Sequence, residues 1–381
     1  MKQNYDIAAY IWPAYTGKEK TMKKSEIGVY YWSNWHPTRQ NSIKRGEGWT
    51  EWEYTKRAIP KFVGHQQPRI PIWGYLDDSK IKVVTNQIQV AHDYGIDGFI
   101  FDYVVDHENA HEEIKAFLNA PNSKLLKFCF LECGQVPENF DAHFEYIINN
   151  FFAKENYWRI DGGLYYSIYE INKYIDAVGS VERLAEIFER FREKTREAGL
   201  GEINLVGIEW GLQARKLKDS PYETAKRLGL NGISSYTWAH NGLPSWPTGS
   251  YREWAEIGYR AMDEIDAMFD IPYYFHVSAG WDCSPRCPED MIFQEGGPLM
   301  YHTLWGEYEI VQKQYFSTII TDDSPEEFKT ALWKIMKKSE EKGRSFVSIN
   351  AWNEWTEGSY LEPDSRYGYG KLEAIRDVCK T

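Results

Sequence analysis

Two glutamates near the C-terminus, Glu354 and Glu357, stand in a setting that suits acid–base chemistry. They lie three residues apart, shortly after an apolar strand-like run at 346–350, and Trp352 and Trp355 flank the first of them. Cleavage of a glycosidic bond needs one carboxylic acid to protonate the leaving oxygen and one carboxylate on the other side of the bond. A Trp beside an acid raises its pKa by excluding water, as a general acid requires near neutral pH. We therefore predict that Glu354 and Glu357 form a catalytic pair.

Acids and aromatic rings recur where the other strand-like runs end. The run at 98–103 ends in Asp102 and Tyr103, and the run at 127–131 is followed by Glu132. Tyr and Trp combine a flat apolar face with a polar group, which matches the C–H faces and hydroxyls of a sugar. The alternative to substrate binding differs between the two groups. The acids would instead anchor neighbouring loops, and the rings at the end of the run at 232–236 and just after it would instead pack in the core. The residues that we predict to bind substrate are Trp12, Asp102, Tyr103, Glu132, Glu209, Trp210, Tyr236, Trp238, His240, Trp281, Trp352, Asn353 and Trp355.

Composition and charge narrow the class of partner. Among the 381 residues there are 16 Trp and 27 Tyr against 18 Phe, an excess of rings that carry a polar atom. This favours a wet groove over a dry interior. The formal net charge is −12, so no general electrostatic attraction draws the chain to nucleic acid or to anionic lipid. The partner we expect is an oligosaccharide or polysaccharide, with no nucleic acid.

The apolar runs and the cysteines exclude further classes. No apolar run approaches the roughly 18 residues of a membrane span, so we expect no membrane insertion. The N-terminus lacks a signal-peptide pattern, which predicts a cytoplasmic location, or a periplasmic or secreted one if a leader was removed. Five cysteines are too few for a disulfide scaffold, and Cys283 and Cys287 lack the two-residue spacer usual at zinc sites. We predict no metal and no cofactor.

Short apolar runs alternate with amphipathic stretches, a pattern typical of parallel strands joined by crossover helices. Strands are expected at 98–103, 127–131, 164–168, 204–208, 232–236, 273–278 and 346–350, and helices at 81–94, 141–153, 181–198, 221–228, 251–268 and 325–342. Ser180 and Ser324 are the expected N-caps of two of these helices. An eighth strand lies at 7–12 or at 27–32, and in the second case residues 1–26 form an N-terminal extension.

We therefore predict a single-domain (β/α)8 TIM barrel over residues 1–381, with long strand-to-helix loops. An open doubly wound sheet is the alternative fold. No Gly-x-Gly-x-x-Gly follows the first strand, which argues against a dinucleotide-binding sheet.

The stretch at 353–363, Asn-Glu-Trp-Thr-Glu-Gly-Ser-Tyr-Leu-Glu-Pro, resembles the signature of glycoside hydrolase family 99-like proteins. More closely, the chain resembles their WbsX-type branch, whose members are labelled as lipopolysaccharide-biosynthesis or glycosyltransferase proteins. Supporting segments lie at 48–52, 64–71, 94–99, 159–165 and 367–369, so the resemblance covers most of the chain from about residue 27 onward.

The resemblance implies a (β/α)8 barrel and metal-independent cleavage of α-linked mannose-type sugars with retention of configuration. Glu354 would act as a base on the 2-hydroxyl of the sugar, whose oxygen attacks the anomeric carbon to give a 1,2-anhydro intermediate. Glu357 would protonate the leaving group and later activate water. The chain departs from the family at its first strand, because an aromatic-Pro-x-aromatic-His-Pro turn is divided here between residues 10–15 and residues 30–37.

Three other functions compete with this one. The first is a WbsX-type glycosyltransferase in polysaccharide biosynthesis, although no Asp-x-Asp lies near a strand end and no Gly-rich phosphate loop is present. The second is a glycosidase whose acids are Glu170 and Asp282, from the fourth and seventh strands. The third is a carbohydrate-binding protein without activity, against which the presence of both motif glutamates argues.

Overall fold

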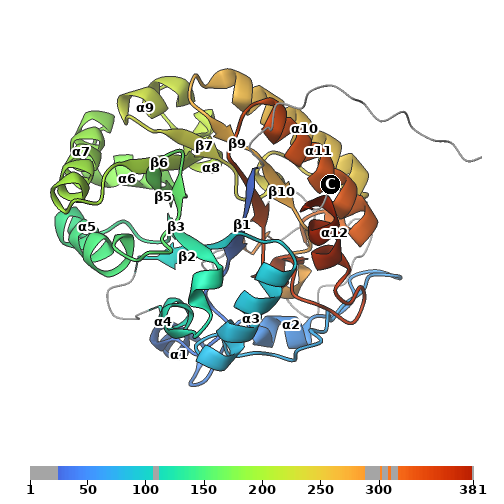
Figure 1. Ribbon diagram of the computed structural model, residues 1–381. Coiled ribbons are helices and arrows are strands. Elements are labelled where there is room, and N and C mark those ends of the chain that lie inside the picture. The colour runs from blue at the N-terminus through green and yellow to red at the C-terminus, as the bar shows by residue number, and fades with distance from the viewer. Residues whose placement is uncertain (1–24, 106–110, 288–300, 303–307, 310–315, 380–381) are drawn as a thin grey trace, which may run out of the picture.

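The computed structural model describes residues 25–105, 111–287, 301–302, 308–309 and 316–379, and their parallel strands close into a barrel surrounded by helices (Figure 1). The strands are β1 (Glu26–Tyr31), β2 (Gly98–Val104), β3 (Lys127–Cys133), β5 (Gly163–Ile168), β6 (Ile203–Ile208), β7 (Gly232–Ser234), β9 (Tyr273–Tyr274), β10 (His276–Ser278) and β14 (Phe346–Asn350). β9 and β10 are separated by Phe275 alone and together form one barrel strand. β7 pairs with β9, β10 with β14, and β14 with β1, which closes the barrel with eight strands. The predicted (β/α)8 fold is confirmed.

The first barrel position belongs to β1, the second of the two predicted candidates. Its Ile27 faces Val347 of β14 and its Gly28 faces Gly98 of β2, so both edges of the strand are paired. The other candidate, at 7–12, lies outside the described residues, and so does Trp12.

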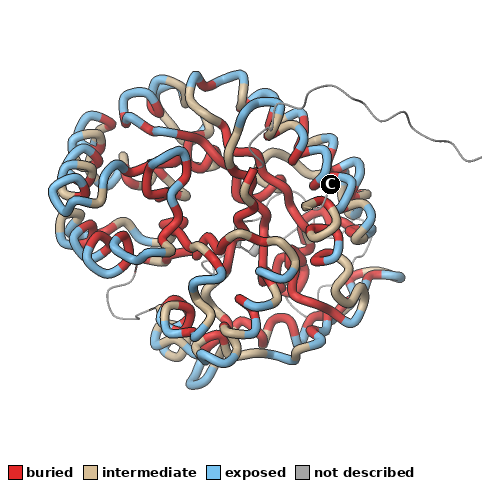
Figure 2. The backbone as a smooth tube through the Cα atoms, in the orientation of Figure 1, coloured by how far each residue is buried: buried red, intermediate tan, exposed pale blue. Residues whose placement is uncertain are grey.

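Helices cover the outside of the barrel, with buried side chains on their inner faces and exposed ones outside (Figure 2). The side chains of Ser180 and Ser324 accept hydrogen bonds from the backbone N–H groups of Arg183 and Glu327, which confirms the two predicted N-caps. In the described part of the chain no helix has the length and apolarity to cross a bilayer. The helices of the outer layer are α3 (Ile81–Asp93), α4 (Glu112–Asn119), α5 (Phe140–Ile147), α6 (Ile171–Val178), α7 (Val181–Glu197), α9 (Pro221–Arg227), α10 (Tyr251–Met268), α11 (Pro325–Glu341) and α12 (Gly370–Cys379). The short helix α8 (Glu209–Leu212) follows β6 directly and lies inside this layer, beside the strands (Figure 1).

Close packing between strands and core rings requires glycine at some barrel positions. A Cβ on Gly98 would lie 2.5 Å from the ring of Trp158 and 2.6 Å from the carbonyl oxygen of Lys127. Because protein interiors are packed as densely as organic crystals, such an atom has no room. The strand therefore approaches the Trp158 ring as closely as a bare backbone allows.

Long segments follow β1, β10 and β14 and build the end of the barrel where the strands finish. The segment after β1 carries α1 (Arg39–Arg45) and α2 (Trp52–Arg57), and the segment after β14 carries the hairpin of β15 (Asn353–Glu354) and β16 (Ser359–Tyr360). Shorter strands lie elsewhere: β4 (Arg159–Ile160), β8 (Thr248–Gly249), β11 (Tyr301–His302), β12 (Tyr308–Glu309) and β13 (Ile319–Ile320).

Candidate active site

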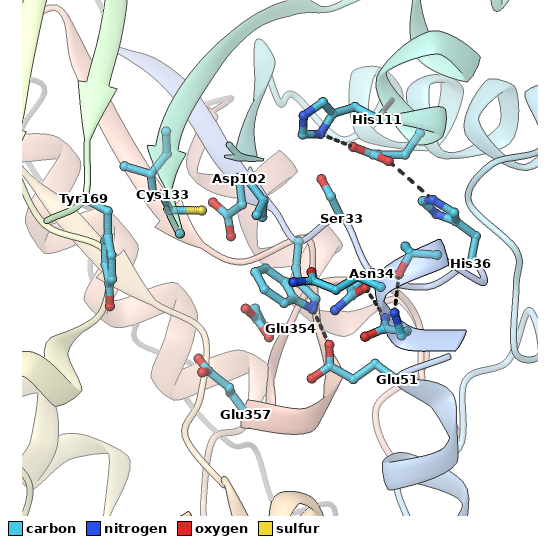
Figure 3. Close-up of a pocket in the computed structure, with 18 of the residues that line it drawn as sticks. Ser33, Asn34, His36, Glu51, Asp102, His111, Cys133, Tyr169, Glu354 and Glu357 are labelled. Atoms are coloured by element: carbon cyan, nitrogen blue, oxygen red, sulfur yellow. Dashed lines mark hydrogen bonds and ion pairs between the residues drawn. The ribbon is translucent and has the colours of Figure 1, made fainter. Parts of the chain in front are cut away.

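A cavity of about 610 Å³ opens at the C-terminal ends of the barrel strands (Figure 3). Active sites of (β/α)8 barrels lie at this end, because the loops that follow the strands converge there. The lining combines side chains from strand ends with side chains from the long loops. Its members include Trp32, Glu51, Asp102, Tyr169, Trp210, Tyr236, His240, Trp281, Arg286, Glu354 and Glu357.

Glu354 and Glu357 reach the cavity from the tight hairpin after β14. Gly358, between β15 and β16, has a positive φ of 67°, and a Cβ at this position would lie 2.8 Å from the Cβ of Asp282. The turn therefore needs glycine. The backbone N–H of Asp282 donates to the carbonyl oxygen of Glu357 at 2.5 Å, which ties the hairpin to the loop after β10. Both glutamates thus have a fixed backbone beside the cavity.

The two tryptophans that flank Glu354 lie on the other face of this hairpin. Trp355 is fully buried, stacks on Tyr360 with ring centres 3.8 Å apart, and donates its indole N–H to Glu362 at 2.7 Å. Trp352 is fully buried in the hydrophobic core of the barrel. The prediction that these two rings contact substrate was wrong, because they hold the hairpin to the barrel instead.

Arg286 joins the two glutamates. Its guanidinium donates to Glu357 at 2.6 Å, to Glu51 at 3.1 Å and to Glu354 at 3.4 Å, and its side chain is 8% exposed. The residue lies in a short 3-10 helix at Ser284–Arg286, in the loop after β10. One buried cation thus faces three carboxylates, so the cluster carries net negative charge if all of its carboxyl groups are ionised.

Burial changes the acidity of both glutamates. It raises the pKa of Glu354 well above its usual range, and the negative charge of Glu357 raises it further, while Arg286 opposes both effects. Burial also raises the pKa of Glu357, against the influence of Arg286. A raised pKa favours the protonated form of a carboxyl group. The pair therefore has the property that acid–base catalysis needs, a carboxylic acid beside a carboxylate.

Asp102, at the end of β2, is linked to Glu354 through Tyr236. The Tyr236 hydroxyl lies 2.9 Å from Oε1 of Glu354 and 3.0 Å from Oδ2 of Asp102. Asp102 is 2% exposed, and burial raises its pKa well above the usual range. Figure 3 shows the carboxyl groups of Asp102 and Glu354 on the same side of the cavity.

A second group of titratable side chains lines the cavity beside the segment after β1. His36 Nδ1 lies 2.6 Å from Asp78, and its Nε2 lies 3.9 Å from Glu113, which also contacts His111 (Figure 3). Although burial opposes it, the contact with Asp78 raises the pKa of His36 to about 9. Tyr103 does not line the cavity as predicted; its ring stacks under His111 with centres 4.1 Å apart.

Aromatic side chains form a third part of the wall. The ring of Trp210 stacks on His240 with centres 4.4 Å apart, and the hydroxyl of Tyr169 lies 2.9 Å from Nε2 of His240. Burial lowers the pKa of His240 well below its usual value, so this imidazole is neutral. The wall thus presents flat faces and uncharged polar groups, a surface that suits sugar rings and hydroxyls.

Of the thirteen predicted binding residues, five line the cavity: Asp102, Trp210, Tyr236, His240 and Trp281. Glu132 does not, although it ends the next strand after Asp102. It is fully buried behind β3, where it accepts hydrogen bonds from Tyr166 and Tyr174 and lies 2.6 Å from Nε2 of His143. Its prediction as a substrate ligand was wrong, because side chains alternate along a strand and Glu132 faces the helices.

Three more predicted residues lie outside the lining. Trp238 is fully buried and donates its indole N–H to the backbone of His276, which fits the core-packing alternative. Glu209 is buried beside Asn241, and burial raises its pKa to about 8. Asn353 bonds to the backbone N–H and carbonyl of Trp32, and so it positions a lining ring without reaching the cavity.

The alternative acid pair of Glu170 and Asp282 does not fit the structure. Asp282 is fully buried, and its Oδ2 accepts from His65 at 2.8 Å and from Gln67 at 2.7 Å. Its Oδ1 accepts from the backbone N–H of Ser284 at 3.0 Å. Both of its oxygens are thus engaged in holding the loop after β10 to the segment after β1.

The lining residues that were not predicted include Trp32, Glu51, Tyr169 and Arg286. Glu51 belongs to the family-like segment at 48–52, so the resemblance contained a signal that the residue analysis did not use. Tyr169 follows the last residue of β5 directly, one register position beyond that of Tyr103 in β2, so its side chain has the opposite facing. Arg286 stands between two cysteines, and nothing in its local sequence points to the glutamates.

Comparison with known proteins assigns the chain to a family. A sequence profile of the family described as glycosyltransferase WbsX matches residues 27–131 and 131–375. The chain belongs to the WbsX family. This WbsX-family chain is 25% identical over 373 residues to the uncharacterised protein WxcX of Xanthomonas campestris pv. campestris, a match that covers 92% of the chain and 49% of WxcX. The chain thus spans about half the length of the curated relatives it matches.

Two solved structures share the fold of this WbsX-family chain. The GH99 endo-α-mannosidase from Bacteroides thetaiotaomicron, in complex with bis-tris-propane, aligns with a TM-score of 0.54 at 15% identity, over 93% of this chain and 95% of the other. A protein described as glycoside hydrolase-like aligns with a TM-score of 0.62 at 13% identity, over 97% and 98% of the two chains. The fold is therefore that of a glycosidase-type barrel.

Proposed function

We propose that this WbsX-family chain is a retaining glycoside hydrolase that cleaves an α-mannoside-like linkage in a bacterial or host glycan. The observation that carries the proposal is the pair of buried glutamates, both held by Arg286 at the C-terminal end of the barrel and both facing a ring-lined cavity. The fold shared with an endo-α-mannosidase and the motif at 353–363 support the mannoside as substrate class.

The hydrogen bonds distinguish the two glutamates. Both oxygens of Glu354 face donors, because Tyr236 lies at Oε1 and Arg286 at Oε2. In the described part of the chain Oε2 of Glu357 is buried without a partner, so it is the oxygen that has room for a proton. We assign Glu354 as the base that takes the proton of the 2-hydroxyl and Glu357 as the acid that protonates the leaving oxygen. The freed 2-oxygen attacks the anomeric carbon, and Glu357 then activates water to open the 1,2-anhydro ring.

The spacing of the pair is compatible with these roles. The two carboxylates contact the two terminal nitrogens of one guanidinium, Glu357 at 2.6 Å and Glu354 at 3.4 Å, which brings them close enough to act on the same glycosidic bond. Trp32 and Trp281 line the same cavity and bring aromatic rings to the sugar, whereas the Trp210 ring already contacts His240 and the ammonium of Lys216.

The test is product release from a panel of α-mannans and O-antigen-type oligosaccharides, with the anomeric proton followed by NMR. The wild type should release a product that is first formed with retained configuration. Glu357→Gln and Glu354→Gln should each lose more than about a hundredfold in kcat, the usual scale of acid–base catalysis, while substrate binding persists. Glu53→Gln, at an exposed glutamate near Glu51, is the matched control and should retain activity. Full turnover by Glu357→Gln would remove Glu357 from the acid role.

A glycosyltransferase is the second candidate, favoured by one feature of the cavity. Arg39, Lys44 and Arg45 of α1 line it, and α1 contains no acidic residue, so this side can attract the diphosphate of a sugar nucleotide. Addition of sugar nucleotides to the same reactions separates the two functions. Transfer that is lost in a Lys44→Glu/Arg45→Glu variant, with no hydrolysis of any glycan by the wild type, would establish the transferase.

A further inference from the structure

The Tyr236 hydroxyl stands between two carboxyl groups and has a single hydrogen to share. It lies 2.9 Å from Oε1 of Glu354 and 3.0 Å from Oδ2 of Asp102, and all three side chains are buried. If both carboxyl groups were ionised, one of the two short contacts would place a hydroxyl lone pair against a carboxylate oxygen. A buried polar contact without its hydrogen is costly, so one of the two carboxyl groups holds a proton and donates it to the Tyr236 oxygen.

The surroundings of the two carboxyl groups differ. Glu354 has Arg286 at 3.4 Å, a positive charge that favours ionisation. For Asp102 no ion pair with a cation is found in the described ranges, and its second oxygen, Oδ1, is buried there without a partner. An ionised Asp102 would leave a charged oxygen uncompensated in a dry environment, which proteins avoid.

We propose that Asp102 is a neutral carboxylic acid whose O–H donates to the Tyr236 oxygen, so that the Tyr236 hydrogen points at Glu354. Asp102 then acts as a positioning residue, because it works on Glu354 through Tyr236. With donors at both oxygens, Glu354 stays ionised in spite of its burial. The role of Glu354 as the catalytic base rests on the proposed function, whereas the protonation of Asp102 does not depend on it.

Other titratable and charged groups face this chain of hydrogen bonds. Burial and the charge of Glu357 both raise the pKa of Asp102, against the hydrogen bond from Tyr236. Groups whose charge acts on Asp102, on Tyr236 or on Glu354 come from several elements: Glu51, Tyr169, Arg286 and Glu357.

Infrared spectroscopy tests the protonation of Asp102 without any substrate. At pH 7 the wild type should show a carboxylic-acid C=O stretch that shifts when the protein is labelled with ¹³C-aspartate. The same band should be absent from Asp102→Asn and present in Glu357→Gln and Glu354→Gln. The isotope label also gives the answer in wild-type protein if Asp102→Asn fails to fold. No shifting band at pH 7, or a band lost only in Glu354→Gln, would overturn the proposal.

The pH profile of kcat/KM tests the consequence for Glu354. Tyr236→Phe removes one donor and should move the acidic limb upward by about one pH unit, since a hydrogen bond to a charged group is worth about that much. Asp102→Asn keeps a donor toward the Tyr236 oxygen and should therefore leave the pH position of this limb unchanged, whatever the substitution does to the height of the profile. Tyr30→Phe is the matched control, since the Tyr30 hydroxyl donates to the backbone of Ser235.

An unshifted limb in Tyr236→Phe, or a shifted one in Asp102→Asn, would contradict the positioning role. Failure of hydrolysis altogether would refute the proposed function and leave the infrared result to decide the state of Asp102.

Discussion

Replacement of Arg286 by Met should make the stability of the protein depend strongly on pH. The substitution removes the cation that faces Glu51, Glu354 and Glu357 and keeps a side chain of similar length. The side chain of Arg286 is 8% exposed, so water does not readily replace it. Each carboxyl group must then either remain charged without a partner or take up a proton.

The magnitude follows from the contact distances and burial. Two unit charges about 4 Å apart attract by about 4 kcal/mol at an effective dielectric constant of 20, which corresponds to about three pKa units. Loss of one partner from a buried ion pair costs about 3–5 kcal/mol in measured cases. We therefore expect Arg286→Met to lower the free energy of unfolding by about 3–5 kcal/mol at pH 7.

The sign of the pH dependence is determined by the raised pKa values of Glu354 and Glu357. A carboxyl group whose pKa is higher in the folded state than in the unfolded state costs nothing below its unfolded pKa, where both states are protonated. Between its unfolded pKa and its folded pKa, such a carboxyl group lowers the stability of the folded protein progressively as the pH rises. Removal of Arg286 raises both folded values further, so the difference between variant and wild type should be small near pH 4 and grow toward pH 7.

Urea denaturation, followed by tryptophan fluorescence between pH 4 and pH 8, measures this difference directly. Arg286→Lys retains the positive charge but not the planar guanidinium. Its free energy of unfolding should therefore fall by less than that of Arg286→Met, and by an amount that changes little with pH. An Arg286→Met variant whose deficit is the same at pH 4 and pH 7 would refute the electrostatic reasoning and leave only a loss of packing. No activity is needed for this measurement.

Three further substitutions test the scaffold of the site. Glu132→Ala should lower the free energy of unfolding by about 3–5 kcal/mol, because three buried donors lose their acceptor, while glycan binding measured by calorimetry stays unchanged. Gly98→Ala should cost about 1–3 kcal/mol in urea denaturation because its Cβ would meet the Trp158 ring, and wild-type stability would contradict the packing. Although burial opposes it, the hydrogen bond from His65 lowers the pKa of Asp282, so its contribution to stability is fully present at neutral pH, begins to decline as the pH falls below about 4, and disappears only at the lowered folded pKa. Asp282→Asn should therefore be less stable than wild type at pH 7, with a deficit that shrinks steadily below pH 4, and a deficit that is the same at pH 7 and at pH 2 would exclude this role.

The barrel could be predicted because its signals are local. Each strand is a short apolar run and each helix has its own periodicity and caps, as at Ser180 and Ser324. The alternation of the two element types leaves few topologies for a parallel sheet. Glu354 and Glu357 were found for the same reason, since only two residues of one hairpin separate them.

Which side chains face the cavity could not be predicted from strand ends alone. Asp102 and Glu132 occupy similar places in neighbouring strands, yet Asp102 faces the cavity and Glu132 lies among His143 and two tyrosines behind the barrel. Alternation along a strand turns a shift of one residue into a change of face. Trp355 begins a short 3-10 helix at Trp355–Glu357, and its ring stacks on Tyr360, away from the cavity that Glu354 faces.

The sequence by itself determined the type and order of the barrel elements and the spacing of Glu354 and Glu357, because these follow from patterns in residues that lie close together in the chain. Only the tertiary structure brought Glu51, Arg286 and Asp102 to the two glutamates, from segments that lie far from the hairpin in the sequence. Side chains from distant loops meet only after the barrel has closed, and the charge balance of the site depends on that meeting. The acid–base character of the two glutamates is for this reason a property of the fold as well as of their motif.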